Sequence, residues 1–364
     1  MQEKTLLDRL MKHTVDDLQD AALRIGVEPT EENMRKVALA ELLAKAVPER
    51  KMDIILRMRE SEYMALSSKV QAEEAITIAK ARLDEPLENA LVILEQYGLA
   101  WRTTSHWQLS SDAQKMMLPS MELKEDLVFH DIISDMLEGW LLHVGMMPLE
   151  TLLDKVTNVP GVDGDSITCL REQAFALLVG RNGFEVIYAD EDTGTLWATS
   201  PDLEDPGKLH ARVTSPTVAP LPYPILTRET LLGCVRGECL PGEKKAYQSL
   251  AEWIIINRPR VSEQECRDIM DTAAYMLQNG EFDEMVYFLM DTVEPKGEKN
   301  IREGEEAITC FVNHIPLWEN KGHSASEMSR ILIASAKQKM PGRNDPSTCG
   351  SGKKYKQCCG RRMN

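Results

Sequence analysis

The chain has 364 residues, 43% of them hydrophobic and 27% charged, which is the composition of a globular protein with two or three domains. No run of eighteen apolar residues is present, and the start MQEKTLLDRL lacks the basic-then-apolar pattern of a secretory signal, so we expect a soluble, cytoplasmic protein without a membrane span. The net charge of −16 opposes binding of a nucleic-acid backbone over the surface as a whole.

Residues 1–50 predict a small helical module. In the segment TVDDLQDAALRIGV, the apolar residues Leu18, Ala22 and Ile25 recur at the spacing of one helical face. Thr14 or Asp16 offers a side-chain oxygen that can cap the start of this helix.

A second helix is expected to begin at Thr30, with Thr30 or Asn33 as its N-cap, and to end before Pro48. The helical pair resembles the Rho N-terminal/SAP-like fold, in which a DDLxxxAxxxG helix precedes a helix led by basic residues, here RKVALAELLAK. In that family the second helix contacts nucleic acid, and the matching positions are Arg35, Lys36 and Lys45. The alternative is a helical pair that docks onto protein, because the acidic residues close by repel phosphate.

Residues 51–125 predict helices that end in a short β-hairpin. Leu87, Leu91 and Leu94 recur with helical spacing before Gly98. The segment LAWRTTSHWQLSS then alternates like a hairpin that turns at Thr104–Ser105. A helix followed by a hairpin is the ending of a winged-helix-like unit.

A second winged-helix-like unit is expected at residues 126–215. Helical periodicity is followed there by the hairpin GFEVIYADEDTGTLWAT, which turns at Asp192–Gly194. Tyr188 and Trp197 in this hairpin, and Trp101 and Trp107 in the first one, are expected to form cross-strand core pairs rather than platforms on which bases stack. The second hairpin is also acidic, which disfavours contact with DNA.

The stretch 201–225 is rich in proline, which predicts an extended connector and a domain boundary. Residues 216–338 then predict a helical domain. Thr227 is expected to open one helix, Ser262 and Glu265 form a capping box for another, and Asn279–Gly280 favours a helix end.

The last segment, residues 339–364, contains PGRNDPSTCGSGKKYKQCCG. It resembles the SEC-C motif, a zinc-binding tail known from the SecA preprotein translocase and from other bacterial proteins. The ligand pattern of the motif is Cys-x-Cys, eight residues, and then Cys followed by Cys or His. Cys349, Cys358 and Cys359 occupy the second, third and fourth ligand positions, and Ser347 occupies the first. The resemblance implies a zinc-ribbon-like tail that binds Zn²⁺.

The serine at the first position changes the expected chemistry. A hydroxyl stays protonated near neutral pH and is a hard, weak donor to zinc. Two outcomes remain open: three thiolates retain zinc with water or a distant residue as the fourth ligand, or zinc is bound weakly or not at all. A catalytic zinc site is disfavoured, because the tail offers no general base apart from Asp345.

Charge is distributed unevenly along the chain. From Pro341 onward there are six basic residues and one acidic residue, so the tail carries about +5 and the remainder about −21. We therefore expect contact with an acidic partner or a polyanion to be made by the tail. The residues expected to make it are Lys353, Lys354, Lys356, Arg361 and Arg362.

Familiar enzyme signatures are missing from the sequence: it has no GxxxxGKS or GxxxxGKT loop, no GxSxG elbow and no HExxH pair. We therefore predict a mainly α-helical, multi-domain, non-enzymatic adaptor that binds a protein partner, and we infer no small-molecule substrate. The SEC-C resemblance implies that the tail does the docking, since in its own family it is associated with a chaperone, ribosomes and anionic lipid. The alternative is a nucleic-acid-binding regulator that uses the SAP-like module and the winged-helix-like units, and an enzyme with a site built from dispersed residues is a third possibility.

Overall fold

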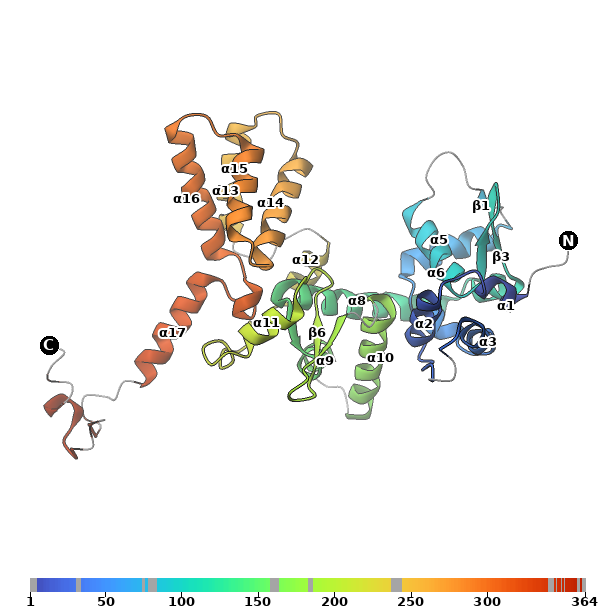
Figure 1. Ribbon diagram of the computed structural model, residues 1–364, viewed down its shortest axis with the longest axis horizontal. Coiled ribbons are helices and arrows are strands. Elements are labelled where there is room, and N and C mark those ends of the chain that lie inside the picture. Colours follow the sequence, from blue (N-terminus) through green and yellow to red (C-terminus); the bar gives the residue numbers. More distant parts are fainter. Residues whose placement is uncertain are drawn as a thin grey trace. The chain divides into compact units, whose positions relative to one another are not determined.

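A computed structural model describes residues 5–30, 34–73, 76–77, 84–157, 164–182, 186–236 and 244–339, and in the tail residues 344, 346, 347, 349, 351–358 and 361. The described chain is mainly helical with two small antiparallel sheets, as the sequence predicts (Figure 1). It divides into two compact units. Unit 1 comprises Met1–Leu142, Met146–Leu203 and Leu226–Glu238, and unit 2 comprises His143–Gly145, Glu204–Ile225 and Cys239–Asn364. Among the helices in the described ranges, none combines the length and apolar character needed to span a membrane.

The first part of unit 1 is a group of helices around one apolar core. Its helices are α1 (Leu6–Leu10), α2 (Val15–Arg24), α3 (Lys36–Ala46), α4 (Lys51–Ile55), α5 (Glu60–Gln71), α6 (Glu85–Gln96) and α7 (Ser111–Met116). Thr14 caps α2 in a capping box with Asp17, and the predicted apolar face of this helix is fully buried. The expected start of the next helix is wrong, because α3 begins at Lys36 with Arg35 as its N-cap. Thr30 precedes the helix, and Asn33 lies outside the described residues.

The predicted hairpin after α6 is present as β2 (Ala100–Arg102) and β3 (His106–Leu109), and β1 (Ile76–Thr77) extends it to a sheet of order β1-β3-β2. The turn lies at Thr104–Ser105 as expected, since Thr103 N donates to His106 O at 2.9 Å. This turn places Arg102 opposite Trp107, so Trp101 faces Gln108 instead. The expected Trp101–Trp107 core pair is therefore wrong, because residues one register step apart point to opposite faces of a sheet.

The second part of unit 1 repeats the combination of helices and hairpin. Its elements are α8 (Met121–Val144), β4 (Met146–Pro148), α9 (Leu149–Thr157), α10 (Gly164–Asn182), β5 (Ile187–Ala189), β6 (Leu196–Thr199) and α12 (Arg228–Val235). The strands form an antiparallel sheet of order β4-β6-β5. Tyr188 lies directly opposite Trp197, which confirms this cross-strand pair, and Gly194 closes the turn with a φ of +70°.

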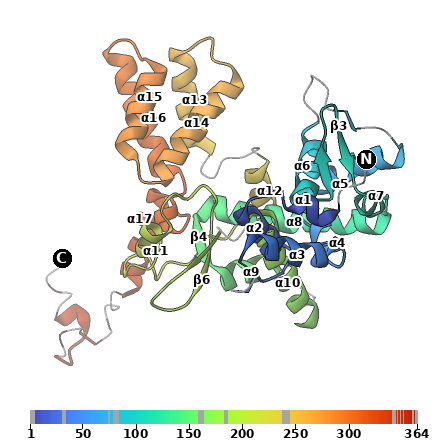
Figure 2. The same cartoon turned by 45° about the vertical axis from the view of Figure 1, so that its right-hand side comes forward.

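Unit 2 contains a bundle formed by α13 (Lys244–Asn257), α14 (Glu263–Gln278), α15 (Phe282–Val293) and α16 (Glu298–His314), which lie side by side in Figures 1 and 2. The predicted capping box of Ser262 and Glu265 starts α14. The bundle core includes Leu250, Trp253 and Phe311, all buried. The turn η3 (Trp318–Asn320) and helix α17 (Ala325–Lys339) then lead toward the tail, which contains η4 (Tyr355–Gln357).

The proline-rich stretch at the start of unit 2 is not the extended connector that its composition predicts. It contains the helix α11 (Pro206–Val213). The Asp205 side chain accepts a hydrogen bond from Lys208 N at 2.8 Å, and Pro206 occupies the first helical turn. Proline is compatible with helix at that position because its missing N–H would have no partner there in any case.

Candidate functional site

The described part of the tail reverses direction over a short stretch. Pro346 and Lys354 form an antiparallel bridge, and Ser347 N donates a hydrogen bond to Lys353 O at 2.8 Å. Gly352 lies within this reversal with a φ of +68°, a conformation that glycine adopts without strain. The chain then enters η4, at whose end Cys358 N donates to Tyr355 O at 3.1 Å. The reversal therefore brings Cys349 close to Cys358.

Two of the predicted metal ligands meet at this point. Cys349 Sγ lies 3.3 Å from Cys358 Sγ and 3.4 Å from Ser347 Oγ. The hydroxyl of Ser351 lies 3.3 Å from Cys358 Sγ. Ser347 itself is 5% exposed, so the residue at the first ligand position is buried against the thiols. Cys359, the remaining predicted ligand, lies outside the described residues.

The donor set fits a zinc ion in part. Zinc–sulfur bonds of about 2.3 Å in a tetrahedron place neighbouring sulfurs roughly 3.8 Å apart, so the two thiols need to separate only slightly to bind one ion. Ser347 points its hydroxyl at the same place, but a hydroxyl is a poor substitute for a thiolate. Within the described ranges no three His, Cys, Asp or Glu residues come close enough together to hold a metal.

The surroundings of Cys349 favour its thiolate form. Hydrogen bonds with Ser347 first, and then with Ser351 and Cys358, lower the pKa of the Cys349 thiol to about 6. A thiolate is both the metal-binding and the nucleophilic form of cysteine. Among the predicted ligands, Cys349 is therefore one whose thiolate is favoured at neutral pH.

The basic residues in the described part of the tail are accessible. Lys353, Lys354, Lys356 and Arg361 are exposed, and Arg362 lies outside the described residues. The three lysines lie between Cys349 and Cys358 in the sequence, and Arg361 follows Cys358, so the described basic residues lie on one short segment. Their charge is the opposite of that of the remaining chain, which carries about −21.

The three basic residues predicted to contact nucleic acid near the N-terminus are spread over α3. Arg35 is the N-cap residue, Lys36 is the first helical residue, and Lys45 lies in the last turn. Arg35 and Lys45 are exposed, and Lys36 is half-buried. Lys36 and Lys45 are nine positions apart, about 2.5 helical turns, so they point to opposite sides of α3. The structure does not bring these three residues onto one face.

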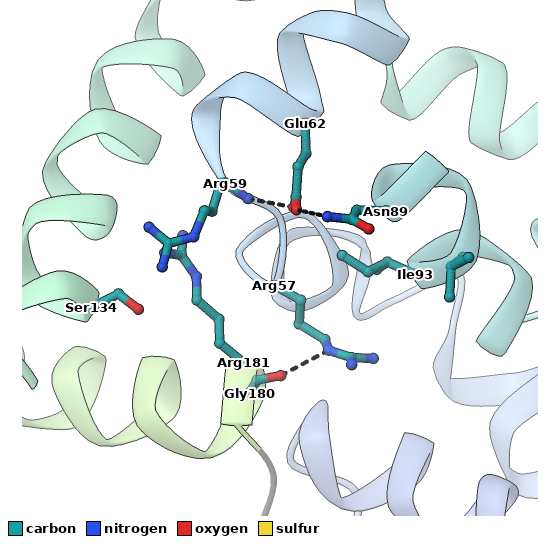
Figure 3. Close-up of a pocket in the computed structure, with 9 residues that line it drawn as sticks. Arg57, Arg59, Glu62, Asn89, Ile93, Ser134, Gly180 and Arg181 are labelled. Atoms are coloured by element: carbon teal, nitrogen blue, oxygen red, sulfur yellow. Dashed lines mark hydrogen bonds between the residues drawn. The ribbon is translucent and has the colours of Figure 1, made fainter. Parts of the chain in front are cut away.

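Sequence reasoning missed a second polar site, a cavity of about 280 Å³ in unit 1 (Figure 3). Its lining includes Arg57 and Arg59, which precede α5, and Arg181, which lies near the end of α10. No motif marks these residues. The RMR spacing of Arg57 and Arg59 is common on surfaces, and Arg181 lies more than a hundred positions away in the sequence.

Comparison with known proteins identifies a motif in the tail. The SEC-C motif matches residues 343–361, which contain all four predicted ligand positions. This match confirms the resemblance inferred from the pattern of cysteines. It covers too little of the chain to assign a family to the whole protein.

The curated relatives also match over short segments. The protein translocase subunit SecA of Chlorobium phaeobacteroides (strain BS1) is 78% identical over 69 residues, which are 18% of this chain and 6% of that protein. The UPF0225 protein Shewana3_2159 of Shewanella sp. (strain ANA-3) is 76% identical over 72 residues, which are 19% of this chain and 44% of that protein. The chain thus spans less than half the length of these relatives. No solved structure matches the chain.

Proposed function

We propose that the chain is a non-enzymatic adaptor whose basic SEC-C tail docks onto an acidic surface of a partner protein. The observation that carries this proposal is the exposed group of basic side chains on a motif-defined turn, attached to a strongly acidic chain. An acidic body repels acidic partners at long range, so the tail is the favourable place for them to bind. In this proposal the thiol cluster is a small zinc-ribbon-like support that holds the basic segment in one conformation.

Capture of partners from a lysate of the native host tests the proposal. The baits are the full chain, a variant with the five tail residues changed to Gln, and a control variant with five exposed lysines of the body changed to Gln. The control residues are Lys12, Lys115, Lys208, Lys296 and Lys299. Both variants lose the same charge, so a difference between them reports position.

We expect an acidic protein to be captured by the full chain and by the control, and to be absent from the tail variant. Capture should weaken at high salt, because interactions between exposed charges are screened. Recovery of the same proteins by all three baits would contradict docking through the tail.

A nucleic-acid-binding regulator is the second candidate, and one observation favours it. The order α8, β4, α9, α10, β5, β6 with the sheet order β4-β6-β5 is a winged-helix-like arrangement, and we propose this description for residues 126–215. The hairpin of this unit, however, exposes Glu191 and Asp192 at its turn, which repels phosphate. The SAP-like description of the α2–α3 pair remains part of this second proposal.

A further inference from the structure

The cavity of unit 1 lies where the start of α5, the middle of α6 and α8, and the end of α10 come together. Its polar lining consists of Arg57, Arg59, Glu62, Asn89, Ser134 and Arg181. Figure 3 shows the side chains of Arg59 and Arg181 on the side of the cavity where Ser134 lies, and the side chain of Arg57 extending to the opposite side. Three guanidinium groups around one cavity form an unusual concentration of N–H donors in a chain with a net charge of −16.

Arg59 has carboxylates of its own. Its Nη1 donates to Asp135 Oδ1 at 2.6 Å, and its Nη2 lies 3.4 Å from Glu138 Oε2. The charge of this guanidinium is therefore compensated inside the protein. Arg59 therefore lines the cavity, but its charge is already balanced by Asp135 and Glu138 and does not require an anion from a ligand.

Only some of the N–H donors of Arg181 have a hydrogen-bond acceptor. Its side chain is 7% exposed, and Nη2 lies 2.8 Å from Asp131 Oδ1 and donates to Met58 O at 2.9 Å. Its Nη1, in contrast, is buried and has no hydrogen-bond partner among the described residues. A buried N–H donor without an acceptor costs free energy, so a group that accepts this hydrogen bond would be favoured in the cavity.

Arg57 is buried without a carboxylate. Its Nε donates to Gly180 O at 2.9 Å, and its Nη1 donates to the Gln96 side chain at 2.8 Å and to the Tyr97 hydroxyl at 2.5 Å. All three acceptors are neutral, and no described carboxylate lies within ion-pairing distance of this guanidinium. Burial lowers the pKa of Arg57, which shows that its charge is poorly solvated where it lies.

Glu62 in the lining of the cavity, and Asp131 beside it, already accept hydrogen bonds. Glu62 accepts hydrogen bonds from Arg59 N at 2.9 Å and from Asn89 Nδ2 at 3.1 Å. Asp131 accepts from Glu60 N at 2.9 Å in addition to pairing with Arg181. The lining of the cavity therefore contains three guanidinium groups and one carboxylate, that of Glu62, so its positive charges are in excess.

We propose that this cavity binds a small molecule through an oxyanion group, a phosphate or a carboxylate, which accepts a hydrogen bond from Arg181 and is attracted by the uncompensated charge of Arg57. Guanidinium groups bind both kinds of group with paired N–H donors. A volume of about 280 Å³ is enough for a small metabolite, since it lies at the lower end of the range of ligand pockets, which begins at about 300 Å³. This site is separate from the tail, and its occupation does not depend on the adaptor role.

Thermal unfolding in inorganic phosphate and in malonate, each compared with chloride at equal ionic strength, tests the proposal. The background is the full chain with the five basic tail residues changed to Gln, so anions bound by the tail do not contribute. At a concentration ten times the Kd we expect the apparent melting temperature to rise by about 3 to 6 °C. A rise with phosphate alone or with malonate alone identifies the group, and no rise with either overturns the proposal.

Three variants locate the effect. Arg57→Gln removes the uncompensated charge, and Val92→Trp fills the cavity from its half-buried rim while leaving every arginine in place. Arg57 also donates a hydrogen bond to Gly180 near the end of α10, so Arg57→Gln could lose the anion effect by disturbing the fold. Val92→Trp tests the cavity without removing that hydrogen bond. Arg102→Gln is the control, since Arg102 stacks on Trp107 away from the cavity. We expect the anion effect to disappear in the first two and to persist in the control, and an equal effect in all three would refute binding in the cavity.

Discussion

The bundle of α13–α16 and the tail maintain their structures by different means. In the bundle, residues such as Leu250 and Phe311 are fully buried, and Gly304 has no room even for a methyl group. Among the described tail residues, Ser347 alone is buried, and the turn depends on backbone hydrogen bonds and contacts between thiols and hydroxyls. In a region without an apolar core, a single substitution can change a metal ligand with little effect on the stability of the rest of the chain. In a close-packed bundle, a single substitution in the core changes the free energy of unfolding.

The largest expected contrast concerns charge. Changing Lys353, Lys354, Lys356, Arg361 and Arg362 to Gln should lower the affinity for heparin or random DNA by about 100-fold or more at low salt, because each phosphate contact contributes about 0.9 to the slope of log K against log salt. Reversing the charges of Arg35, Lys36 and Lys45 should leave the affinity nearly unchanged. Filter binding at two salt concentrations measures both effects side by side.

The same pair of variants distinguishes the two functional proposals. A protein whose DNA affinity falls in the N-terminal variant, but persists in the tail variant, would favour the nucleic-acid-binding regulator. In that case the salt slope should drop by roughly one for each phosphate that the variant no longer binds.

A smaller effect is expected from filling the bundle. In Gly304→Ala the new Cβ would lie 2.5 Å from the ring of Trp253, whose Nε1 is fixed by a hydrogen bond to Asn300 O at 2.9 Å. Overpacking of this kind costs about 1 to 3 kcal/mol of the free energy of unfolding. Glu305→Ala, at the exposed neighbouring position of α16, is the matched control and should change stability by less than about 0.5 kcal/mol in urea unfolding. Equal stabilities would mean that α13 and α16 are less tightly packed than described.

The sequence predicted local structure well where a side chain forms its hydrogen bond with residues only a few positions away. Three such cases were the N-cap Thr14, the capping box of Ser262 with Glu265 and the Thr104–Ser105 turn, in which the partners lie within three or four positions of one another. The start of α3 was not predicted, because its N-cap Arg35 makes no side-chain cap hydrogen bond. Helix α11 was missed because proline at the first turn permits a helix that proline elsewhere would break.

The two sites differ in how far the sequence could reveal them. The thiol cluster was predictable because a metal site confined to one turn has fixed spacings, and the SEC-C match confirms the motif. The cavity of unit 1 was not predictable, since Arg57 and Arg181 come to line one cavity only through tertiary packing of α10 against the first helices. What distinguishes them from surface arginines is burial and, in Arg181, an unsatisfied donor, which sequence does not record.

Restoring a cysteine at the first ligand position should increase the affinity of the tail for zinc. Ser347 Oγ lies 3.4 Å from Cys349 Sγ, so Ser347→Cys would place a third described thiol at the cluster. We expect zinc to be retained against a chelator at about tenfold higher concentration, because thiolates bind zinc far better than hydroxyls. Ser351→Cys is the control: its oxygen lies 3.3 Å from Cys358 Sγ, but it is not a ligand position of the motif. Equal zinc retention in both variants, or no gain in either, would refute the role assigned to the first position.

The smallest expected effect is that of removing the tail altogether. Deletion of residues 341–364 should change the free energy of unfolding of the rest by less than about 0.5 kcal/mol, because stabilisation follows buried apolar area and the described tail residues bury almost none. The loss of about five positive charges adds only weak repulsion within an acidic body at physiological salt. Urea unfolding of the truncated chain measures this, with Gly304→Ala in the same assay as the variant that must show a change. A destabilisation as large as that of Gly304→Ala would mean that the tail packs into the body, and the contrast between the two regions would then be wrong.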